Sequence, residues 1–168
     1  MTIIRRACPA DAVALSRLFQ TCFTATFGHL YRPDDLQAFL SQQPPDRWEK
    51  ELGDPDFAIW LAEADRRALG YAKLGPPTLP VEPRGPSAEL RQLYLLAEAH
   101  GRGIADALLA EVIAEAKSRG AADLYLSVFV DNHRAKRFYC RHGFERIGTY
   151  AFMVGSHEDE DDVMRRAL

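Results

Sequence analysis

The chain alternates between segments whose apolar residues follow helical spacing and segments with strand-like patterns. Proline or acidic residues suited to a first turn open most of the helical segments. Helices are predicted to begin near residue 9 and to cover 33–40, 44–52, 103–118 and 131–140. The first has the apolar members Val13, Leu15, Leu18 and Phe19. The helix at 103–118 has the clearest apolar stripe, formed by Ile104, Ala107, Leu108, Val112, Ile113 and Ala116.

Segments rich in β-branched and aromatic residues predict strands at 2–6, 57–63, 68–74, 89–95, 124–130, 144–152 and 163–168. The proline-rich segment 75–86 is predicted to be a surface connection, and the acidic run 158–162 a loop. The order is one strand, helices, three strands, a helix, a strand, a helix and two strands. It indicates a single mixed α/β domain over 1–168, with a central sheet and helices on its faces.

Composition narrows the function classes. The net charge is -3, so there is no general attraction to nucleic acid. Cys8, Cys22 and Cys140 form no Cys-x-x-Cys pair, and the histidines lie at no metal-ligand spacing, so neither a metal site nor a disulfide framework is expected. The start resembles no signal peptide, and no apolar run approaches the roughly 18 residues of a membrane span. We therefore expect a cytoplasmic protein with no membrane partner.

A strand, a glycine-containing loop and the long helix follow one another over 93–110. Backbone N–H groups at a helix start lack internal partners, and the helix dipole adds partial positive charge there, so the junction suits a phosphate. Gly101 and Gly103 permit close approach and positive φ, while His100 and Arg102 add donors. Asp106 replaces the third glycine of a dinucleotide fingerprint, and no Walker lysine follows. From these residues alone, a plain glycine turn stays open.

Three pieces in the right order resemble the GNAT superfamily of acetyltransferases. They are the strand, loop and helix start at 93–105, the Asn-x-x-Ala-x-x-Phe-Tyr pattern at 132–139, and the Gly143-Phe144 pair that follows. The likeness spans most of the chain and looks greatest to bacterial polyamine N-acetyltransferases of the PaiA type, which act on spermine and spermidine. It implies a mostly antiparallel mixed sheet of about seven strands, with a splayed strand pair at the coenzyme site. One departure is His100, where the family usually has Arg or Gln.

The resemblance implies acetyl-CoA as cosubstrate, with its pyrophosphate at the loop and its pantetheine arm along the preceding strand. The residues expected to bind it are Leu93, Tyr94, Leu95, His100, Gly101, Arg102, Gly103, Ile104, Ala105, Asp106, Asn132, Ala135 and Tyr139. The family's strand offers backbone rather than side chains, so the Leu95 N–H is the expected oxyanion donor. Asn132 is expected to hydrogen-bond the pantetheine arm, to cap the following helix, or both.

Amide formation needs a neutral amine, and the departing thiolate needs a proton. Tyr139 is the candidate for protonating the thiolate, because a phenol is protonated at pH 7 and the resemblance gives this role to the tyrosine of the Phe-Tyr pair; a core tyrosine on an apolar helix face is the alternative. Glu89 is the candidate base, directly or through water. Strand alternation would place it on one face with Arg91, Leu93 and Leu95. A surface ion pair between Glu89 and Arg91, and a water chain without any carboxylate, stay open.

The predicted function is acetyl transfer from acetyl-CoA to a primary amine, with a polyamine as one candidate acceptor. A protein N-terminus or lysine side chain is a second candidate. A coenzyme-binding regulatory domain without turnover is an alternative from another class, although retention of both Tyr139 and the glycine loop favours an enzyme. The acidic run could attract a polycationic amine or be an ordinary solvated loop. The expected partners are a small amine and, as an open alternative, a second copy of the chain.

Overall fold

The computed structural model describes residues 1–168. Its strands are β1 (Ile3–Arg6), β2 (Ala58–Ala64), β3 (Arg67–Gly75), β4 (Ser87–Leu95), β5 (Asp123–Phe129), β6 (Glu145–Val154) and β7 (His157–Ala167). Its α-helices are α1 (Ala12–Phe27), α2 (Pro33–Leu40), α3 (Pro45–Gly53), α4 (Ile104–Ser118) and α5 (His133–Arg141). None of these helices combines the length and apolar character needed to cross a bilayer.

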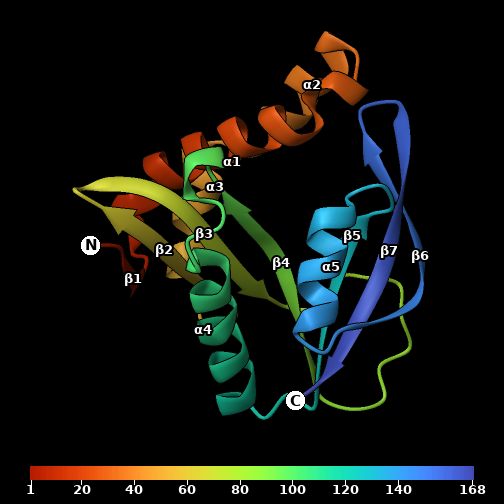
Figure 1. Ribbon diagram of the computed structural model, residues 1–168. Coiled ribbons are helices and arrows are strands. Elements are labelled where there is room, and N and C mark those ends of the chain that lie inside the picture. Colours follow the sequence, from red (N-terminus) through yellow and green to blue (C-terminus); the bar gives the residue numbers. More distant parts are fainter.

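All seven strands form one sheet in the order β1-β2-β3-β4-β5-β7-β6. Every neighbouring pair is antiparallel except β4 and β5, which are parallel. Helices α1 to α3 cover one face of the sheet, and α4 and α5 cover the other (Figure 1). This confirms the predicted mixed, mostly antiparallel sheet with helices on its faces.

Two apolar cores hold the layers together. Leu108, Leu109 and Val112 of α4 are fully buried against one face of the sheet. On the other face, aromatic residues of α1 pack with Trp48 of α3, and Phe19 and Trp48 have ring centroids 6.5 Å apart. The burial of these side chains is the main force that keeps helices and sheet together.

Two predicted core positions are wrong. Val13 of α1 is exposed because it lies on the solvent side of its helix. In α4, Ala107 is exposed and Leu109 is buried in its place. The sheet-facing stripe of α4 is therefore slightly rotated from the predicted one.

The acidic run 158–162 is not a loop, contrary to the prediction. It forms the first half of β7, which pairs with β6 on one side and β5 on the other. Asp159, Asp161 and Asp162 are each less than 9% exposed. Aspartate and glutamate are depleted in strands, so the local composition gave no strand signal. Pairing on both sides and specific partners for the aspartates stabilise the strand instead.

Strands β4 and β5 separate soon after they meet. Only Ser87, Ala88 and Glu89 pair with β5, whereas β4 continues to Leu95 and β5 to Phe129. Figure 1 shows the two ribbons close at one end and apart at the other. A register shift between β3 and β4 leaves Arg91 without a counterpart, which is a β-bulge in β4 just where the separation begins.

Arg5 of β1 joins the N-terminal segment to the sheet through a partly exposed ion-pair group. Its guanidinium contacts Asp11 at 2.8 Å and Glu63 of β2 at 3.0 Å. The hydrogen bond from Arg5 is the main reason that the pKa of Asp11 is lowered to about 2. In the unfolded chain, the pKa of an aspartate carboxyl is near 3.9. Ionised Asp11 therefore stabilises the folded state above about pH 4, and this stabilisation is lost as the pH falls towards 2.

We therefore expect Asp11→Asn to lower the free energy of unfolding at pH 7 by about 1 kcal/mol, a figure reduced for solvent screening of a partly exposed pair. Urea denaturation at pH 7 and at pH 2.5 measures the effect, and the difference from wild type should shrink at the lower pH. Asp56→Asn is the control, because Asp56 is exposed and its carboxylate has no ion pair. Equal losses for the two variants at pH 7 would contradict the assignment.

Candidate active site

Two cavities meet where β4 and β5 separate. One, of about 480 Å³, lies between the start of α4 and the face of α5. The other, of about 370 Å³, lies under α1 and is bounded by β4, β6 and β7. The residues that line both are Phe27, Leu93, Tyr94, Asn132, Ala135 and Tyr139. We call the first the loop cavity and the second the aromatic cavity; a ligand in one reaches a ligand in the other at these shared residues.

The loop cavity is bordered by a run of unsatisfied backbone donors. Gly101 and Gly103 have φ of 72° and 73°, and Gly103 is the N-cap of α4. The amides from Gly101 to Asp106 donate to no acceptor within the protein; the next one, of Ala107, binds the Gly103 carbonyl at 3.1 Å. Together with the helix dipole, this arrangement suits a bound anion. The side chain of Arg102 is exposed and does not line the cavity.

His100 ties this loop to its surroundings. Its Nε2 lies 3.2 Å from the carbonyl oxygen of Leu95, and its Nδ1 lies 2.8 Å from Nη1 of Arg134. Burial and the charge of Arg134 lower the pKa of His100. A neutral ring that donates from Nε2 and accepts at Nδ1 satisfies both contacts. The unusual histidine thus links β4, the loop and α5 through its side chain.

The backbone of Leu95 faces the gap between the strands. The next amide, of Leu96, donates to Leu69 on the β3 side at 2.8 Å, and the Leu95 carbonyl accepts from His100 on the other side. Because backbone groups alternate along a strand, the Leu95 N–H also points away from β3. No β5 residue pairs with it there. This N–H is therefore available to an oxygen atom placed in the gap.

Tyr139 lies at the junction of the two cavities. It comes from α5, is 8% exposed, and packs edge-on against Phe144 at 5.6 Å. Its hydroxyl has no hydrogen-bond partner within the protein. Burial raises its pKa, so the phenol stays protonated through the neutral range and can donate a proton.

Asn132 does cap α5, as one reading predicted. Its Oδ1 accepts from the amide of Ala135 at 3.2 Å. The side-chain NH₂ group is left over for another acceptor, and Asn132 lines both cavities. Capping and a ligand contact are thus compatible in this structure.

Glu89 lines the aromatic cavity but does not share a face with Leu93 and Leu95. Leu90 and Leu93 both belong to the α4-side core, although three positions separate them, because the bulge at Arg91 interrupts the alternation. The predicted common face is therefore wrong. The carboxylate of Glu89 accepts from the amides of Thr78 and Leu79, and Arg91 lies 3.5 Å away, so the alternative ion pair is present.

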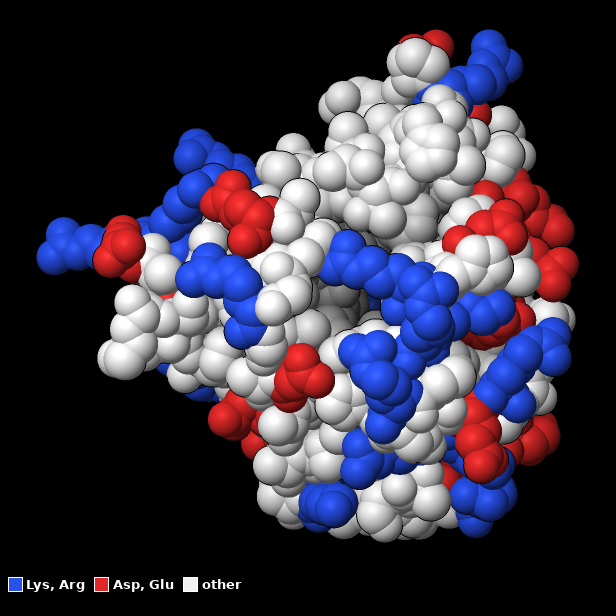
Figure 2. All heavy atoms as spheres, in the orientation of Figure 1, with Lys and Arg blue, Asp and Glu red and all other residues white.

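The sequence interpretation missed two groups of residues. The first is a row of three arginines on α5 that lines the loop cavity, at spacing i, i+3 and i+7: Arg134, Arg137 and Arg141. Their helical spacing on one face was a usable signal. Figure 2 shows Lys and Arg gathered over α5 beside the hollow at the middle of this face. The second comprises Tyr150 and Phe152 of β6 in the aromatic cavity; Asp159 and Asp161 of β7 also line it, and they belong to the acidic run that the sequence offered as a possible attractant for a polycationic amine.

Comparison with known proteins agrees with this geometry. Residues 13–144 match the model of the acetyltransferase (GNAT) family. The chain belongs to that family. An uncharacterized N-acetyltransferase of Mycobacterium tuberculosis is 35% identical over 159 residues, which cover 94% of this chain and 98% of the relative. One from Lactobacillus delbrueckii subsp. lactis is 27% identical over 160 residues, covering 94% and 91%.

Solved acetyltransferase structures have the same fold. The PaiA N-acetyltransferase of Thermoplasma acidophilum, in complex with coenzyme A, superposes with a TM-score of 0.83 at 22% identity, covering 100% of this chain and 99% of that one. The ribosomal-protein-alanine N-acetyltransferase of Brucella melitensis gives 0.76 at 27% identity, covering 99% of each chain. The family match and the 35% relative therefore make this protein a GNAT acetyltransferase, and the solved structures show that its fold is the one these enzymes share.

We expect Gly103→Val to weaken acetyl-CoA binding at least tenfold, because the side chain strains a positive-φ position and stands before the unpaired amides. Gly120→Val is the matched control: Gly120 has φ of 79° and open space around it, and it lies just past the other end of α4. Both variants should lose similar stability. Calorimetric titration with acetyl-CoA separates them, and equal affinities would remove the loop from the coenzyme site.

Proposed function

We propose that this protein transfers the acetyl group of acetyl-CoA to a primary amine by direct attack in a ternary complex. The observation that carries the proposal is the meeting of two cavities at the β4–β5 gap, with the unpartnered hydroxyl of Tyr139 at their junction. A thioester entering from one cavity and an amine from the other would come together there. Holding both reactants makes the bimolecular step effectively unimolecular.

The loop cavity is the proposed coenzyme site. Its six free amides, from Gly101 to Asp106, suit the pyrophosphate, and the α5 arginines add positive charge along its wall. The exposed backbone edge of β4, over Leu93–Leu95, can pair with the amide groups of the pantetheine arm as an added strand would. Asn132 and Ala135 border the arm's path towards the junction.

The junction supplies the groups that acetyl transfer needs. The amine nitrogen bonds to the thioester carbon, whose oxygen becomes negatively charged and accepts from the Leu95 N–H. When the carbon–sulfur bond breaks, the thiolate takes the phenolic proton of Tyr139. The proton that the amine must lose goes to a carboxylate or to a water that one holds. Glu89 was the sequence candidate for that role, and it lines the aromatic cavity.

The aromatic cavity is the proposed amine site. Phenylalanine and tyrosine side chains from α1, β4 and β6 form much of its wall, and besides Glu89 its buried acidic groups are Asp159 and Asp161. Such a lining suits an alkyl ammonium, whose methylenes contact rings and whose charge meets carboxylates. The fold likeness to a PaiA N-acetyltransferase is in keeping with a polyamine acceptor.

A peptide N-terminus is the second candidate acceptor. The observation in its favour is the likeness, at 27% identity, to a structure named for ribosomal-protein-alanine N-acetyltransferase. A regulatory domain that binds acetyl-CoA without turnover would keep the loop but have no use for a free phenol at the junction.

The free thiols of Cys8, Cys22 and Cys140 suit a reducing compartment, and we propose that the enzyme works in the cytoplasm.

A thiol-release assay against polyamines, monoamines, amino acids, aminoglycosides and peptides beginning with alanine or serine distinguishes these candidates. We expect release of coenzyme A with a primary amine, and with polyamines above peptides. Release with peptides alone would assign the second candidate. Tight acetyl-CoA binding without release for any acceptor would contradict an amine acetyltransferase and favour the regulatory domain.

We expect Tyr139→Phe to lower kcat about 100-fold or more with little change in acetyl-CoA affinity, because general acid catalysis is lost while the ring still packs. Tyr125→Phe is the control, since Tyr125 is fully buried in β5 and lines neither cavity. Steady-state kinetics and calorimetry provide the two readouts. Unchanged turnover in Tyr139→Phe would remove this residue from the mechanism.

A further inference from the structure

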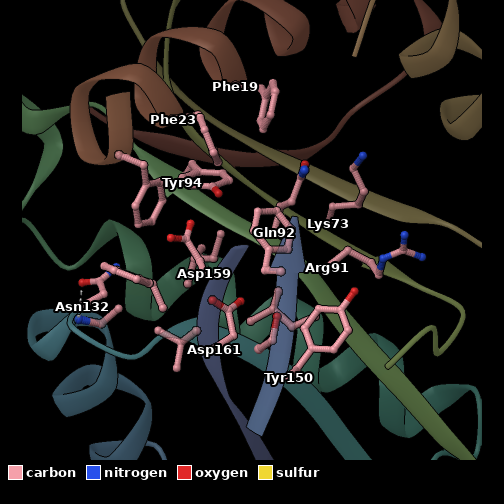
Figure 3. A pocket seen from close by; sticks show the side chains of 18 of the residues that line it. Phe19, Phe23, Lys73, Arg91, Gln92, Tyr94, Asn132, Tyr150, Asp159 and Asp161 are labelled. Atoms are coloured by element: carbon pink, nitrogen blue, oxygen red, sulfur yellow. Dashed lines mark hydrogen bonds between the residues drawn. The ribbon is translucent and has the colours of Figure 1, made fainter. Parts of the chain in front are cut away.

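Strand β7 sends two aspartates into the aromatic cavity. Asp159 and Asp161 are 6% and 7% exposed and line its wall, whereas Asp162 faces the opposite side of the sheet, towards Lys136 of α5. This division follows from the alternation of side chains along a strand. In Figure 3 both aspartates lie between Asn132, at the junction, and Arg91 and Lys73, at the far end of the cavity.

The three buried aspartates of β7 differ in their polar partners. Asp162 is held by two cations, Arg146 at 2.7 Å and Lys136 at 2.5 Å. Asp159 accepts from the hydroxyl of Tyr31 and lies 3.1 Å from His157 Nε2. Asp161 has no cationic partner in the protein, and the hydroxyl of Ser127 is the polar group beside it. A buried carboxylate without a cation is costly, which calls for a positively charged ligand.

The other carboxylates at the aromatic cavity already have cationic partners. Glu51 of α3 is shared by Lys73 and Arg47, and Glu89 is paired with Arg91. None of these groups leaves a free anion for an incoming ammonium group. The acidic side chains of this cavity without a lysine or arginine partner are therefore the two β7 aspartates.

We propose that Asp159 and Asp161 form the subsite for the acceptor's ammonium group, and that Asp161, not Glu89, takes the proton from it. The inference rests on the proposed transfer to an amine and specifies its acceptor as a cationic alkyl amine. Asp159 is a binding group, oriented by Tyr31. Asp161 is a catalytic residue because it contacts the reacting nitrogen.

The proton balance is complete with these residues. The ammonium nitrogen gives one proton to Asp161, and its freed electron pair bonds to the thioester carbon. As the carbon–sulfur bond breaks, the thiolate takes the proton of Tyr139, and the nitrogen's second proton restores that phenol. The products are an acetamide and coenzyme A thiol, and Asp161 returns its proton to solvent.

The contacts of the two carboxylates favour Asp161 over Glu89 as the proton acceptor. Glu89 accepts from the Thr78 and Leu79 amides at 2.6 and 3.2 Å, so its lone pairs anchor the 75–86 connection. Asp161 accepts from no backbone amide, and burial, with the negative charges of Asp159 and Asp162, raises its pKa to about 6 despite the nearby hydroxyl of Ser127. A base that titrates near neutral pH is well suited to this transfer.

The groups that face Asp161 from neighbouring elements are tyrosines: Tyr31 beyond α1, Tyr94 of β4, Tyr139 of α5 and Tyr150 of β6. Burial raises the pKa values of Tyr31, Tyr94 and Tyr139, so these three phenols stay protonated through the neutral range. On β7 itself, Asp159 lines the same cavity and is bound to the imidazole of His157. The Asp161→Asn variant therefore decides whether the acidic limb of a kcat/KM profile belongs to Asp161.

Binding of spermidine and n-butylamine to the coenzyme A complex tests the subsite, by calorimetry. We expect wild type to bind at least one of them, and Asp159→Asn and Asp161→Asn to weaken that binding at least tenfold. Glu160→Gln is the matched control, because it removes one charge from an exposed position of the same run. Unchanged affinity in both aspartate variants, an equal loss in Glu160→Gln, or no binding of either amine to wild type overturns the inference.

The pH dependence of kcat/KM for the bound amine tests proton transfer. In wild type we expect activity to rise with pH through about 6, as Asp161 loses its proton. Asp161→Asn should lose this pH dependence, and its kcat/KM should fall about 100-fold. Asp161→Glu should recover part of the activity. Glu89→Gln should keep the pH dependence of wild type. A limb kept in Asp161→Asn and lost in Glu89→Gln overturns the assignment. Failure of the proposed function looks different, because thiol release would then be absent with every acceptor.

Discussion

The structure depends on one interruption of hydrogen bonding in the middle of a sheet. Strands β4 and β5 pair through three residues of β4 and then separate, which leaves backbone groups such as the Leu95 N–H without a strand partner. The bulge at Arg91 starts the separation, and aromatic packing helps to maintain it: Phe27 of α1 lies edge-on to Phe129 of β5, 6.0 Å between ring centroids. Buried backbone donors need acceptors, so a ligand or water must satisfy the N–H groups that face the gap.

The same gap separates charges of opposite sign. On the α5 side, unpaired amides and three arginines create a positive wall suited to phosphates. On the α1 side, Asp159 and Asp161 create a negative site suited to an ammonium group. Under the proposed function, an anionic coenzyme and a cationic amine would each meet charge of the opposite sign on its own side of the gap.

Much of this could be predicted from the sequence, and what could not be predicted has physical causes. Helical spacing, proline starts and the glycine loop predicted the elements up to α5, because these signals are local. The face of Glu89 was wrong because a bulge is set by pairing with β3, which local pattern does not show. The second half of β7 was predicted as a strand, but its acidic first half was predicted as a loop, because the partners of that half, Tyr31, Lys136 and Arg146, come from other parts of the chain. The roles of Tyr139, Glu89 and the coenzyme loop stay predictions that the proposed variants test.

The matched family segment, residues 13–144, ends just before β6 and β7 begin. It contains the glycine loop, α4 and α5, whereas the final hairpin carries Tyr150, Phe152 and both cavity aspartates. The tip of this hairpin is attached to α2 through hydrogen bonds from Ser156 to Asp35. If the proposed amine site is right, substitutions at its cavity-facing positions change acceptor choice during evolution and leave the proposed coenzyme loop as it is. Exchanging this hairpin between relatives is accordingly a natural route to new amine preferences on one unchanged catalytic frame.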